Sequence, residues 1–450
     1  MEKDPYKITR EFIKTPPQSF MQRIKFLGPG MILSASIVGS GELIATTTLG
    51  AQAGFVTFWV IIISCLVKVA VQIEFAKHTI LTGETPMTAF NELPGWKPGG
   101  VSWSVWSVFL FMLIKLLQVG GIVGGVAILV NMVVPSLSIT VAAFMVAALV
   151  SLLIFKGYYR FIEKVSIWMI AAFTIFAFMS LYFLKFTPYE LTLDAFLSGL
   201  TFRLPPEAVA VAIGAFGITG VGGDEIIFYN YWCIEKGYAA YAGPAHSDEG
   251  WEMRAKGWIR TMKLDAIVAM VIYTLVTAAF YLLGAAVLNA MGEVPEGYAM
   301  LETLSSIFTA SMGPEMYWVF MAGSFFILFS TLFASLAAWV RMFTDIFGKF
   351  GWIDFNSVKE RKMALAISAW AIPFLWALLF VFIKMPVLMV LTGGIVGSFI
   401  LFLVVGIIVR IRYKRVLPGF VPGVVYDVVL WVSILSIAFI GGYSLIQLFV

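Results

Sequence analysis

The sequence predicts an all-α integral membrane protein with eleven transmembrane helices, arranged as a 5+5 inverted repeat with one helix appended. Three observations lead to this prediction. The 450 residues are 60% hydrophobic and only 12% charged, with a mean hydropathy of +0.94. Such a composition lies far outside that of soluble domains. Long apolar runs recur along the chain, and one glycine-rich acidic motif occurs twice.

The predicted helices are apolar runs of about 20 residues, the length needed to cross the hydrocarbon of a bilayer. They cover 26–50, 54–81, 103–133, 138–155, 163–185, 205–233, 263–290, 316–348, 361–383, 386–410 and 425–448. Residues 1–25 are polar and basic and lack the features of a signal peptide, so we expect a cytoplasmic segment followed by a retained first span. Cys65 and Cys233 fall within spans or at their ends, which supports neither a disulfide framework nor a thiolate metal site.

The basic residues predict the orientation of the chain, because Lys and Arg collect on the cytoplasmic side of short loops. With a cytoplasmic N-terminus, the outside segments hold only Lys185, Arg203 and Lys384. Lys68 and Lys115 lie inside spans, and the other basic residues lie in or beside the inside segments. We therefore expect a plasma-membrane protein with its C-terminus outside. The net charge of +4 follows from this topology and gives no reason to expect nucleic acid as a partner.

The glycine-rich motif of the first span returns in the sixth. Val38-Gly39-Ser40-Gly41-Glu42-Leu43-Ile44 matches Val221-Gly222-Gly223-Asp224-Glu225-Ile226-Ile227, with Ser36 opposite Thr219. These spans are an odd number of crossings apart, so the two copies cross the membrane in opposite directions. We expect one repeat in 26–185, its inverted partner in 205–410, and an additional helix at 425–448.

The glycines of both copies predict broken helices in spans 1 and 6. Glycine weakens a helix by about 1 kcal/mol per residue relative to alanine. Carbonyls freed by a break persist in a membrane only where they line a cavity or meet a ligand. A carboxylate at that depth costs roughly 2.5 kcal/mol or more unless a cation or another partner meets it. Breaks at matching positions of inverted halves point to the midplane site of a secondary transporter.

This reasoning predicts a site for a cation. Its proposed ligands are Glu42, Glu225, Asp224 and the backbone at Gly39 and Val221, with Ser40, Gly41, Thr219, Gly222 and Gly223 lining the same space. Glycine pairs also serve close helix packing, and a buried Glu can be neutral and hydrogen-bonded. The repeated acid favours a binding site over these readings. The repeat aligns Glu225 with Glu42, and which of Asp224 and Glu225 faces the cavity stays open.

Further stretches carry a resemblance to a known family. They are Gly28-Pro29-Gly30, Leu81-Thr82-Gly83-Glu84, Leu264-Asp265, Gly284-Ala285-Ala286-Val287, Phe329-Ser330-Thr331 and Thr344-Asp345. At low identity over spans 1 to 8, they resemble the NRAMP family of divalent-metal transporters. The resemblance implies a LeuT-like fold, with broken helices 1 and 6.

The resemblance fails at the substrate motifs of the family. Where the family has Asp-Pro-Gly-Asn in helix 1, this chain has Gly39-Ser40-Gly41-Glu42, and Val221-Gly222-Gly223 replaces a methionine followed by Pro-His. The soft thioether ligand is lost, and all-oxygen sites favour Mg²⁺, Ca²⁺ or Mn²⁺. Mg²⁺ is usually held with several waters. The sequence is therefore similar to the magnesium-transporting offshoot of the family, in which the metal is a substrate and not a cofactor.

Proton coupling is expected to be weak or absent, because Lys115 and Gln118 align with the acidic pair of the family's proton pathway. Lys115 is expected either to pair with one of the site carboxylates, in competition with a bound cation, or to be a structural partner. Elsewhere, Glu74 with Lys77 and Lys68 reads as a local ion-pair network.

The primary hypothesis is a carrier of a hard divalent metal cation, Mg²⁺ or Mn²⁺, that works by alternating access. The alternative is a carrier of an organic amine or amino-acid-like solute, in which Glu42 or Glu225 binds an ammonium group or a coupling Na⁺ ion. No HExxH, GxSxG or P-loop pattern occurs, so neither enzyme activity nor a cofactor is expected. The partners that follow are the lipid bilayer and the metal ion, whereas the sequence does not give the oligomeric state.

Overall fold

The part of the chain that the structure describes is helical and contains no strand. The structure, a computed structural model, describes residues 4–39, 41–246, 248–292, 294, 302–303, 305, 309 and 313–447. Within these ranges the side chains of Gly41, Glu42, Ile44, Glu207, Ala210, Val211, Gly214, Ala215, Ile218, Gly441 and 443–447 are not described.

The first half of the chain contains both short and long helices. They are α1 (Phe20–Ile24), α2 (Pro29–Ile37), the π-helix η2 (Gly41–Thr46), α3 (Thr47–Ala53), α4 (Phe58–Val67), α5 (Val69–Thr82), α6 (Pro86–Asn91), α7 (Trp103–Val133), α8 (Ile139–Ile154) and α9 (Tyr159–Phe183). The predicted first span is thus divided among α2, η2 and α3, and the predicted second span between α4 and α5.

The second half also contains both short and long helices. Its helices are α10 (Leu193–Ser198), α11 (Val209–Ile218), α12 (Gly223–Lys236), α13 (Tyr238–Ala242), α14 (Trp251–Leu283), η6 (Gly284–Leu288), α15 (Asn289–Met291), α17 (Met316–Lys349), α18 (Val358–Ile383), α19 (Pro386–Lys414) and α20 (Val424–Gln447). The predicted sixth span is divided between α11 and α12. The predicted seventh span is longer than expected, because its helix already begins at Trp251.

Seven helical segments among the described residues are long and apolar enough to cross a membrane. They are Phe58–Thr82, Trp103–Val133, Tyr159–Phe186, Trp251–Met291, Met316–Lys349, Val358–Ile383 and Pro386–Lys414. The helix α8 and the segment Val424–Ile440 of α20 are apolar but shorter, and the first and sixth predicted spans are each interrupted. The all-helical membrane fold is thus observed, whereas length and hydropathy identify seven of the eleven predicted spans.

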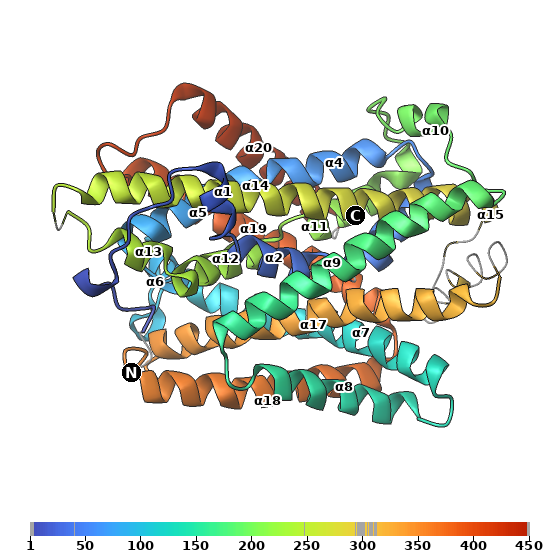
Figure 1. Ribbon diagram of the computed structural model, residues 1–450, viewed down its shortest axis with the longest axis horizontal. Coiled ribbons are helices and arrows are strands. Elements are labelled where there is room, and N and C mark those ends of the chain that lie inside the picture. The colour runs from blue at the N-terminus through green and yellow to red at the C-terminus, as the bar shows by residue number, and fades with distance from the viewer. Residues whose placement is uncertain are drawn as a thin grey trace.

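The long helices run roughly along the longest axis of the molecule (Figure 1). One group consists of α7, α8, α17 and α18, which pack against one another along one edge of the view. A second group consists of α2, α5, α12 and α14. The helix α9 crosses the view diagonally and contacts α2, α14 and α17, and α19 contacts both α7 and α12. The interrupted helices therefore face the first group from within the second.

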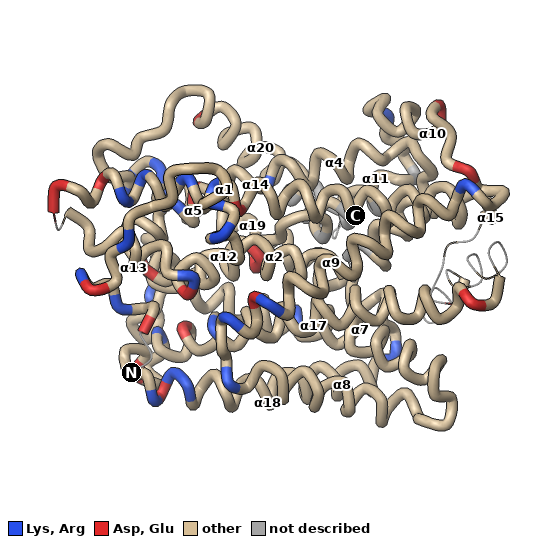
Figure 2. Tube along the Cα trace, viewed as in Figure 1, with Lys and Arg blue, Asp and Glu red and all other residues tan. Residues whose placement is uncertain are grey.

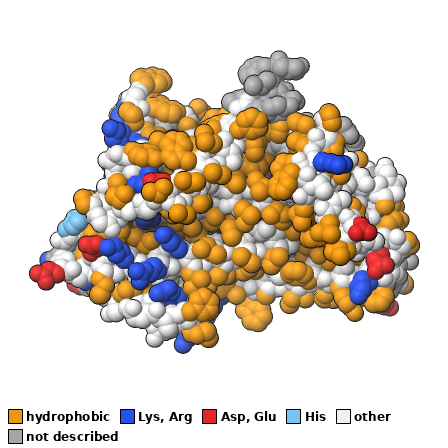
Figure 3. All heavy atoms as spheres, turned by 90° about the horizontal axis from the view of Figure 1, so that it is seen from above, with side chains coloured by type: hydrophobic (Ala, Val, Ile, Leu, Met, Phe, Trp, Pro, Cys, Tyr) orange, Lys and Arg blue, Asp and Glu red, His pale blue; other side chains and the backbone are white. Residues whose placement is uncertain are grey.

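The charged residues are distributed as expected for a membrane protein. Figure 2 shows Lys, Arg, Asp and Glu gathered at the two ends of the helices, with most of them at the end where α1, α13 and the N-terminus lie. Hydrophobic side chains cover the middle of the face seen in Figure 3. An apolar belt between charged ends matches the hydrocarbon of a bilayer flanked by its polar interfaces.

The start of the first interrupted helix is fixed by a buried carboxylate. Gly28 is the N-cap of α2, and Pro29 occupies its first turn, where no amide N–H is needed. The N–H groups of Gly28 and Gly30 donate to the Asp265 carboxylate at 2.8 and 2.5 Å, and Tyr229 Oη donates to it at 2.9 Å. Asp265 thus satisfies amides that the helix leaves unpaired. It anchors α2 to α14 and α12, consistent with a structural role.

Candidate functional site

The first break follows Ile37, where α2 ends. Val38 has extended backbone angles, and helical structure resumes in the π-helix at Gly41. The hydroxyl of Thr331 on α17 donates to the carbonyl of Val38 at 3.3 Å, which satisfies one acceptor that the break frees. A β-carbon built on Gly39 would overlap this hydroxyl. The glycine is therefore required for α17 to approach the broken backbone closely.

The second break separates α11, which ends at Ile218, from α12, which begins at Gly223. Gly220 has a φ of +67°, a conformation that L residues rarely adopt. A β-carbon on it would also lie 2.9 Å from the Cα of Cys65. A β-carbon on Gly223 would overlap the backbone of Leu401 on α19. Both the turn and the helix packing therefore need glycine here.

The carbonyls freed at the end of α11 have polar partners on α4 and at its C-terminus. Lys68 Nζ donates to the carbonyl of Phe216 and, at 2.8 Å, to that of Thr219. Ser64 Oγ lies 3.1 Å from both carbonyl oxygens. Thr219 thus lies at the break as expected, but its environment differs from the predicted one because a lysine reaches it.

The two adjacent acids of α12 lie at its first turn, where the helix dipole favours negative charge. Asp224 is 3% exposed and pairs with Lys115 of α7, which is 4% exposed, at an Nζ–Oδ1 distance of 2.6 Å. Glu225 is half-buried. Its carboxylate lies over Gly222, where a β-carbon would overlap Glu225 Oε2 and lie 3.3 Å from Asp224 Oδ1. Both carboxylates therefore meet at this glycine.

These carboxylates border a small central cavity of about 30 Å³. It is lined by Ser36, Ile37, Lys115, Gln118, Val119, Ile122, Asp224, Glu225, Thr331, Ser335 and Trp339. The lining comes from α2, α7, α12 and α17, so both halves of the chain contribute. A space of this size holds about one or two water molecules. Gln118 Oε1 is buried and has no hydrogen-bond partner within the described structure.

The predicted site residues fall into three groups. Asp224, Glu225, Lys115 and Gln118 line one cavity, whereas Gly39, Val221, Gly222, Gly223 and Thr219 lie at the two breaks beside it. Gly41 opens the π-helix after the first break. Ser40 and the side chain of Glu42 lie outside the described residues. The convergence of Glu42 with Glu225 thus stays a prediction. No group of three or more His, Cys, Asp and Glu side chains suited to a metal ion occurs among the described residues.

The polar contacts agree with the sequence prediction only in part. Glu74 pairs with Lys77 at 2.6 Å, as predicted, but Lys68 Nζ instead reaches the carbonyls at the end of α11. Thr331 and Ser335 line the cavity one helical turn apart on α17. Two hydroxyl residues at i and i+4 of an apolar span lie on the same face of its helix, and this spacing was the sequence signal that could have identified them.

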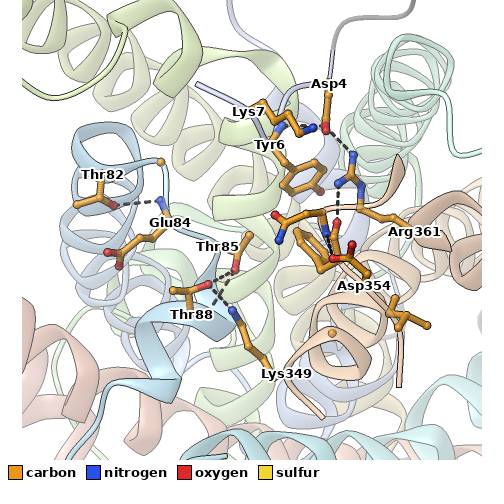
Figure 4. Close-up of a pocket in the computed structure, with 15 residues that line it drawn as sticks. Asp4, Tyr6, Lys7, Thr82, Glu84, Thr85, Thr88, Lys349, Asp354 and Arg361 are labelled. Atoms are coloured by element: carbon orange, nitrogen blue, oxygen red, sulfur yellow. Dashed lines mark hydrogen bonds and ion pairs between the residues drawn. The ribbon is translucent and has the colours of Figure 1, made fainter. Parts of the chain in front are cut away.

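A second cavity, of about 360 Å³, lies at the charged end of the molecule beneath the N-terminal segment (Figure 4). Arg361 donates to Asp4 Oδ1 at 2.6 Å, and Lys349 donates to Thr88 Oγ1 at 2.7 Å. Tyr6 Oη donates to Glu235 Oε1 at 2.9 Å. Burial, followed by the charge of Glu235, raises the pKa of Tyr6 well above its ordinary value, so this hydroxyl remains a donor at neutral pH.

Glu84 lines the same cavity and has strong basic partners. It lies 3.2 Å from His78 Nε2 and accepts from Arg415 at 2.7 Å. Burial would raise the pKa of Glu84, but the hydrogen bonds from His78 and Arg415 outweigh it and lower the pKa to about 2. Two of the acids that line this cavity, Asp4 and Glu84, are thus paired with arginines. The interrupted helices and the unpaired polar lining lie at the central cavity instead.

Comparison with known protein families gives one match. The family model described as "Natural resistance-associated macrophage protein-like" matches residues 30–447. The comparison with curated proteins gives no match.

Solved structures with a similar fold come from several kinds of transporter. The manganese transporter of Eremococcus coleocola, in complex with an aromatic bis-isothiourea substituted compound, is 14% identical with a TM-score of 0.57, over 98% of this chain and 99% of that one. MhsT in complex with L-phenylalanine is 13% identical with a TM-score of 0.58, over 95% and 100%. Mhp1, a nucleobase-cation-symport-1 family transporter, is 14% identical with a TM-score of 0.56, over 97% and 93%. At these identities the likeness concerns the fold, which is LeuT-like.

Proposed function

Because the chain belongs to the natural resistance-associated macrophage protein-like family, whose members are transporters and not enzymes, we propose that it carries a hard divalent metal cation across the membrane. The proposed substrate is Mg²⁺ or Mn²⁺. In this family the metal is the transported substrate and not a cofactor.

One observation carries this proposal. Two interrupted helices border a single cavity that is lined by two carboxylates, Asp224 and Glu225. A broken helix supplies backbone oxygens, and carboxylates supply charge. Together these are the ligands that hard divalent cations prefer. Glu42, on the helix after the first break, is the proposed third carboxylate.

The choice of a hard ion rests on the chemistry of the lining. Among the described residues, the polar lining is made of hydroxyl, amide and carboxylate oxygens together with the Lys115 ammonium, without sulfur or imidazole. Oxygen donors select Mg²⁺, Mn²⁺ or Ca²⁺ over softer transition metals.

The proposed transport cycle is alternating access with Lys115 as an internal competitor. In the observed state its ammonium neutralises Asp224. An arriving divalent cation displaces the ammonium from the carboxylate, and its departure lets the pair form again. Because Lys115 and Gln118 supply no carboxylate for a proton relay on α7, we propose weak or no coupling to protons.

We propose that this carrier lies in the plasma membrane with its N-terminus in the cytoplasm. The crowding of Lys and Arg at the end that carries the N-terminus supports this orientation (Figure 2). The proposed halves remain 26–185 and 205–410, with residues 1–25 as a cytoplasmic segment and 425–448 as an additional helix.

Uptake into proteoliposomes that contain a divalent-sensitive dye tests the proposal. Glu225→Gln and Glu42→Gln are each expected to abolish Mg²⁺ and Mn²⁺ uptake, because each removes a charge that offsets dehydration of the ion. The matched control is Glu252→Gln on the exposed surface of α14, where the side chain is 51% exposed. This control is expected to keep wild-type flux. Unchanged uptake in both site variants would contradict the proposal.

The same preparation addresses the alternative substrate, an organic amine or amino-acid-like solute. Thermal stabilisation by Mg²⁺ or Mn²⁺, and not by amines or amino acids, is expected for a metal carrier. The reverse pattern would favour the alternative. Acidification of the lumen that tracks metal uptake would show that proton coupling is strong.

A further inference from the structure

Lys68 is a buried cation outside the acidic cavity. It lies at the junction of α4 and α5, where it is both the C-cap of one helix and the N-cap of the next. The residue is 0% exposed. Its ammonium donates to the carbonyl oxygens of Phe216 and Thr219, and it lies 4.5 Å from the centre of the Phe216 ring.

The surroundings of this ammonium form a compact set of oxygens. Ser64 Oγ lies 3.1 Å from each of the two carbonyl oxygens, and Thr219 Oγ1 donates to Ser64 Oγ at 2.9 Å. The carbonyls belong to the last turn of α11 and the residue that follows it. The end of a helix carries partial negative charge. Exposed carbonyls at the end of a broken transmembrane helix coordinate monovalent cations in transporters.

A purely structural reading explains this arrangement less well. Burying an ammonium costs several kcal/mol before any partner is counted, and a neutral hydroxyl or amide satisfies carbonyls without that cost. Ser64 already offers such a neutral donor. A lysine here therefore indicates that the oxygen cluster calls for positive charge as well as for hydrogen-bond donors.

We propose that the oxygens of Phe216, Thr219 and Ser64 form a monovalent-cation site, and that the Lys68 ammonium is its resident cation. A tethered cation holds the end of α11 without a diffusible ion. Replacing Lys68 by a short side chain would open the site to Na⁺ or to a small amine such as methylammonium. This inference rests on the contacts at the end of α11 and not on the identity of the transported substrate.

Thermal unfolding of the purified full-length protein tests the proposal without measuring transport. Midpoints are compared in NaCl, methylammonium chloride and N-methyl-D-glucamine chloride at equal ionic strength. The wild type is expected to unfold at the same temperature in all three. Lys68→Ala is expected to unfold at a lower temperature in N-methyl-D-glucamine and to recover several degrees in Na⁺ or methylammonium. Lys256→Ala, which removes a half-exposed lysine, is the control and is expected to show no cation dependence.

Lys68→Gln separates charge from hydrogen bonding, because the amide keeps donors but carries no charge. It is expected to show the same cation-dependent recovery as Lys68→Ala. A variant that can be purified in folded form only when Na⁺ or methylammonium is present throughout would support the proposal equally. The proposal is overturned if Lys68→Gln matches the wild type in N-methyl-D-glucamine, or if folded Lys68→Ala shows no recovery. It is also overturned if neither variant folds in any of the salts, or if the wild type itself gains stability specifically from Na⁺.

Discussion

The buried ion pair between Lys115 and Asp224 sets the electrostatics of the central cavity. Both residues are almost fully buried, and the 2.6 Å contact leaves Glu225 as the carboxylate without a lysine partner among the described residues. Removing one member of a buried pair leaves an uncompensated charge. Loss of either partner is therefore costly, and in the proposed mechanism a cation replaces the ammonium when it binds between the acids.

Lys115→Met is expected to lower the free energy of unfolding by about 3–5 kcal/mol in metal-free buffer, because Asp224 then lacks a partner. Mg²⁺ or Mn²⁺ is expected to restore most of this loss, so the thermal shift on adding metal should be larger in the variant than in the wild type. Differential scanning fluorimetry measures both. Equal shifts in the two proteins would mean that Lys115 does not compete with the metal. Lys256→Met is the exposed control.

Glu84 offers a residue-level test in acid. Its pKa is lowered from 4.5 to about 2 in the folded protein by His78 and Arg415, against the effect of burial. A carboxylate whose pKa is lower in the folded than in the unfolded protein stabilises the fold at pH values above its unfolded-state pKa. This stabilisation is lost as the pH falls towards its folded-state pKa. The difference in melting temperature between wild type and Glu84→Gln is therefore expected to be full at pH 6, to shrink below about pH 4.5 and to vanish near pH 2. A constant difference across this range would contradict the assignment.

At the scale of helices, the N-terminal end of α2 depends on Asp265. This single carboxylate accepts from Gly28, Gly30 and Tyr229 and so joins three elements. The first break lies one short helix away from this anchor. Asp265 therefore holds the first half-helix against α14 while leaving its other end, at Ile37, beside the cavity.

Asp265→Ala is expected to lower the free energy of unfolding by about 3 kcal/mol or more, since each hydrogen bond to a charged group is worth about 1.5–3 kcal/mol. Tyr229→Phe removes only one of these bonds, and a loss of about 1.5–3 kcal/mol is expected for it. Urea unfolding monitored by Trp fluorescence ranks the two variants. A larger loss of stability in Tyr229→Phe than in Asp265→Ala would contradict the role of Asp265 as the anchor of α2.

The sequence predicted the positions of the helices better than the contacts of the buried charged side chains. Hydropathy located the long helices, because an apolar run of membrane-spanning length has few other uses, and the paired glycines located the breaks at Ile37 and Ile218. Which acid would meet Lys115 depended on how α7 and α12 lie relative to each other in the fold, and neighbouring residues of a helix point in different directions. Lys68 was assigned to Glu74 from proximity along the chain, whereas its contacts with α11 depend on tertiary packing.

At the scale of the whole molecule, the N-terminal segment connects the two groups of helices. Tyr6 donates to Glu235 on α12, and Arg361 on α18 pairs with Asp4 and lies 4.7 Å from the centre of the Tyr6 ring. The helices α12 and α18 belong to different groups. The proposed alternating access moves the groups apart at one end, and the contacts of this segment are expected to oppose that motion at the N-terminal end.

Tyr6→Ala is expected to favour opening at this end by about tenfold or more, because it removes a hydrogen bond to a charged group worth about 1.5–3 kcal/mol. The readout is the rate at which Ser335→Cys in the central cavity reacts with a membrane-impermeant maleimide. The native Cys65 and Cys233 are buried and provide a low background. Lys7→Ala in the same segment is the control. Equal labelling rates of Ser335→Cys with and without Tyr6→Ala would show that the N-terminal segment does not hold this end closed.

The whole-molecule prediction of two inverted halves rests on five matched positions of one seven-residue motif, and its weakest point is the acid that this motif repeats. The breaks border one cavity, and Asp224 and Glu225 line it. The convergence of Glu42 on the same space is the central claim of the proposed mechanism. It follows from repeat symmetry alone and needs a direct observation.

Anomalous diffraction from crystals soaked in Mn²⁺ is the most direct measurement of this claim. The account predicts one strong peak in the cavity between α2, α7, α12 and α17, within coordination distance of the carboxylates of Glu42 and Glu225. In crystals of the double variant Glu42→Gln, Glu225→Gln the peak is expected to be absent. A peak elsewhere in the molecule, or a peak in this cavity that survives in the double variant, would contradict the account.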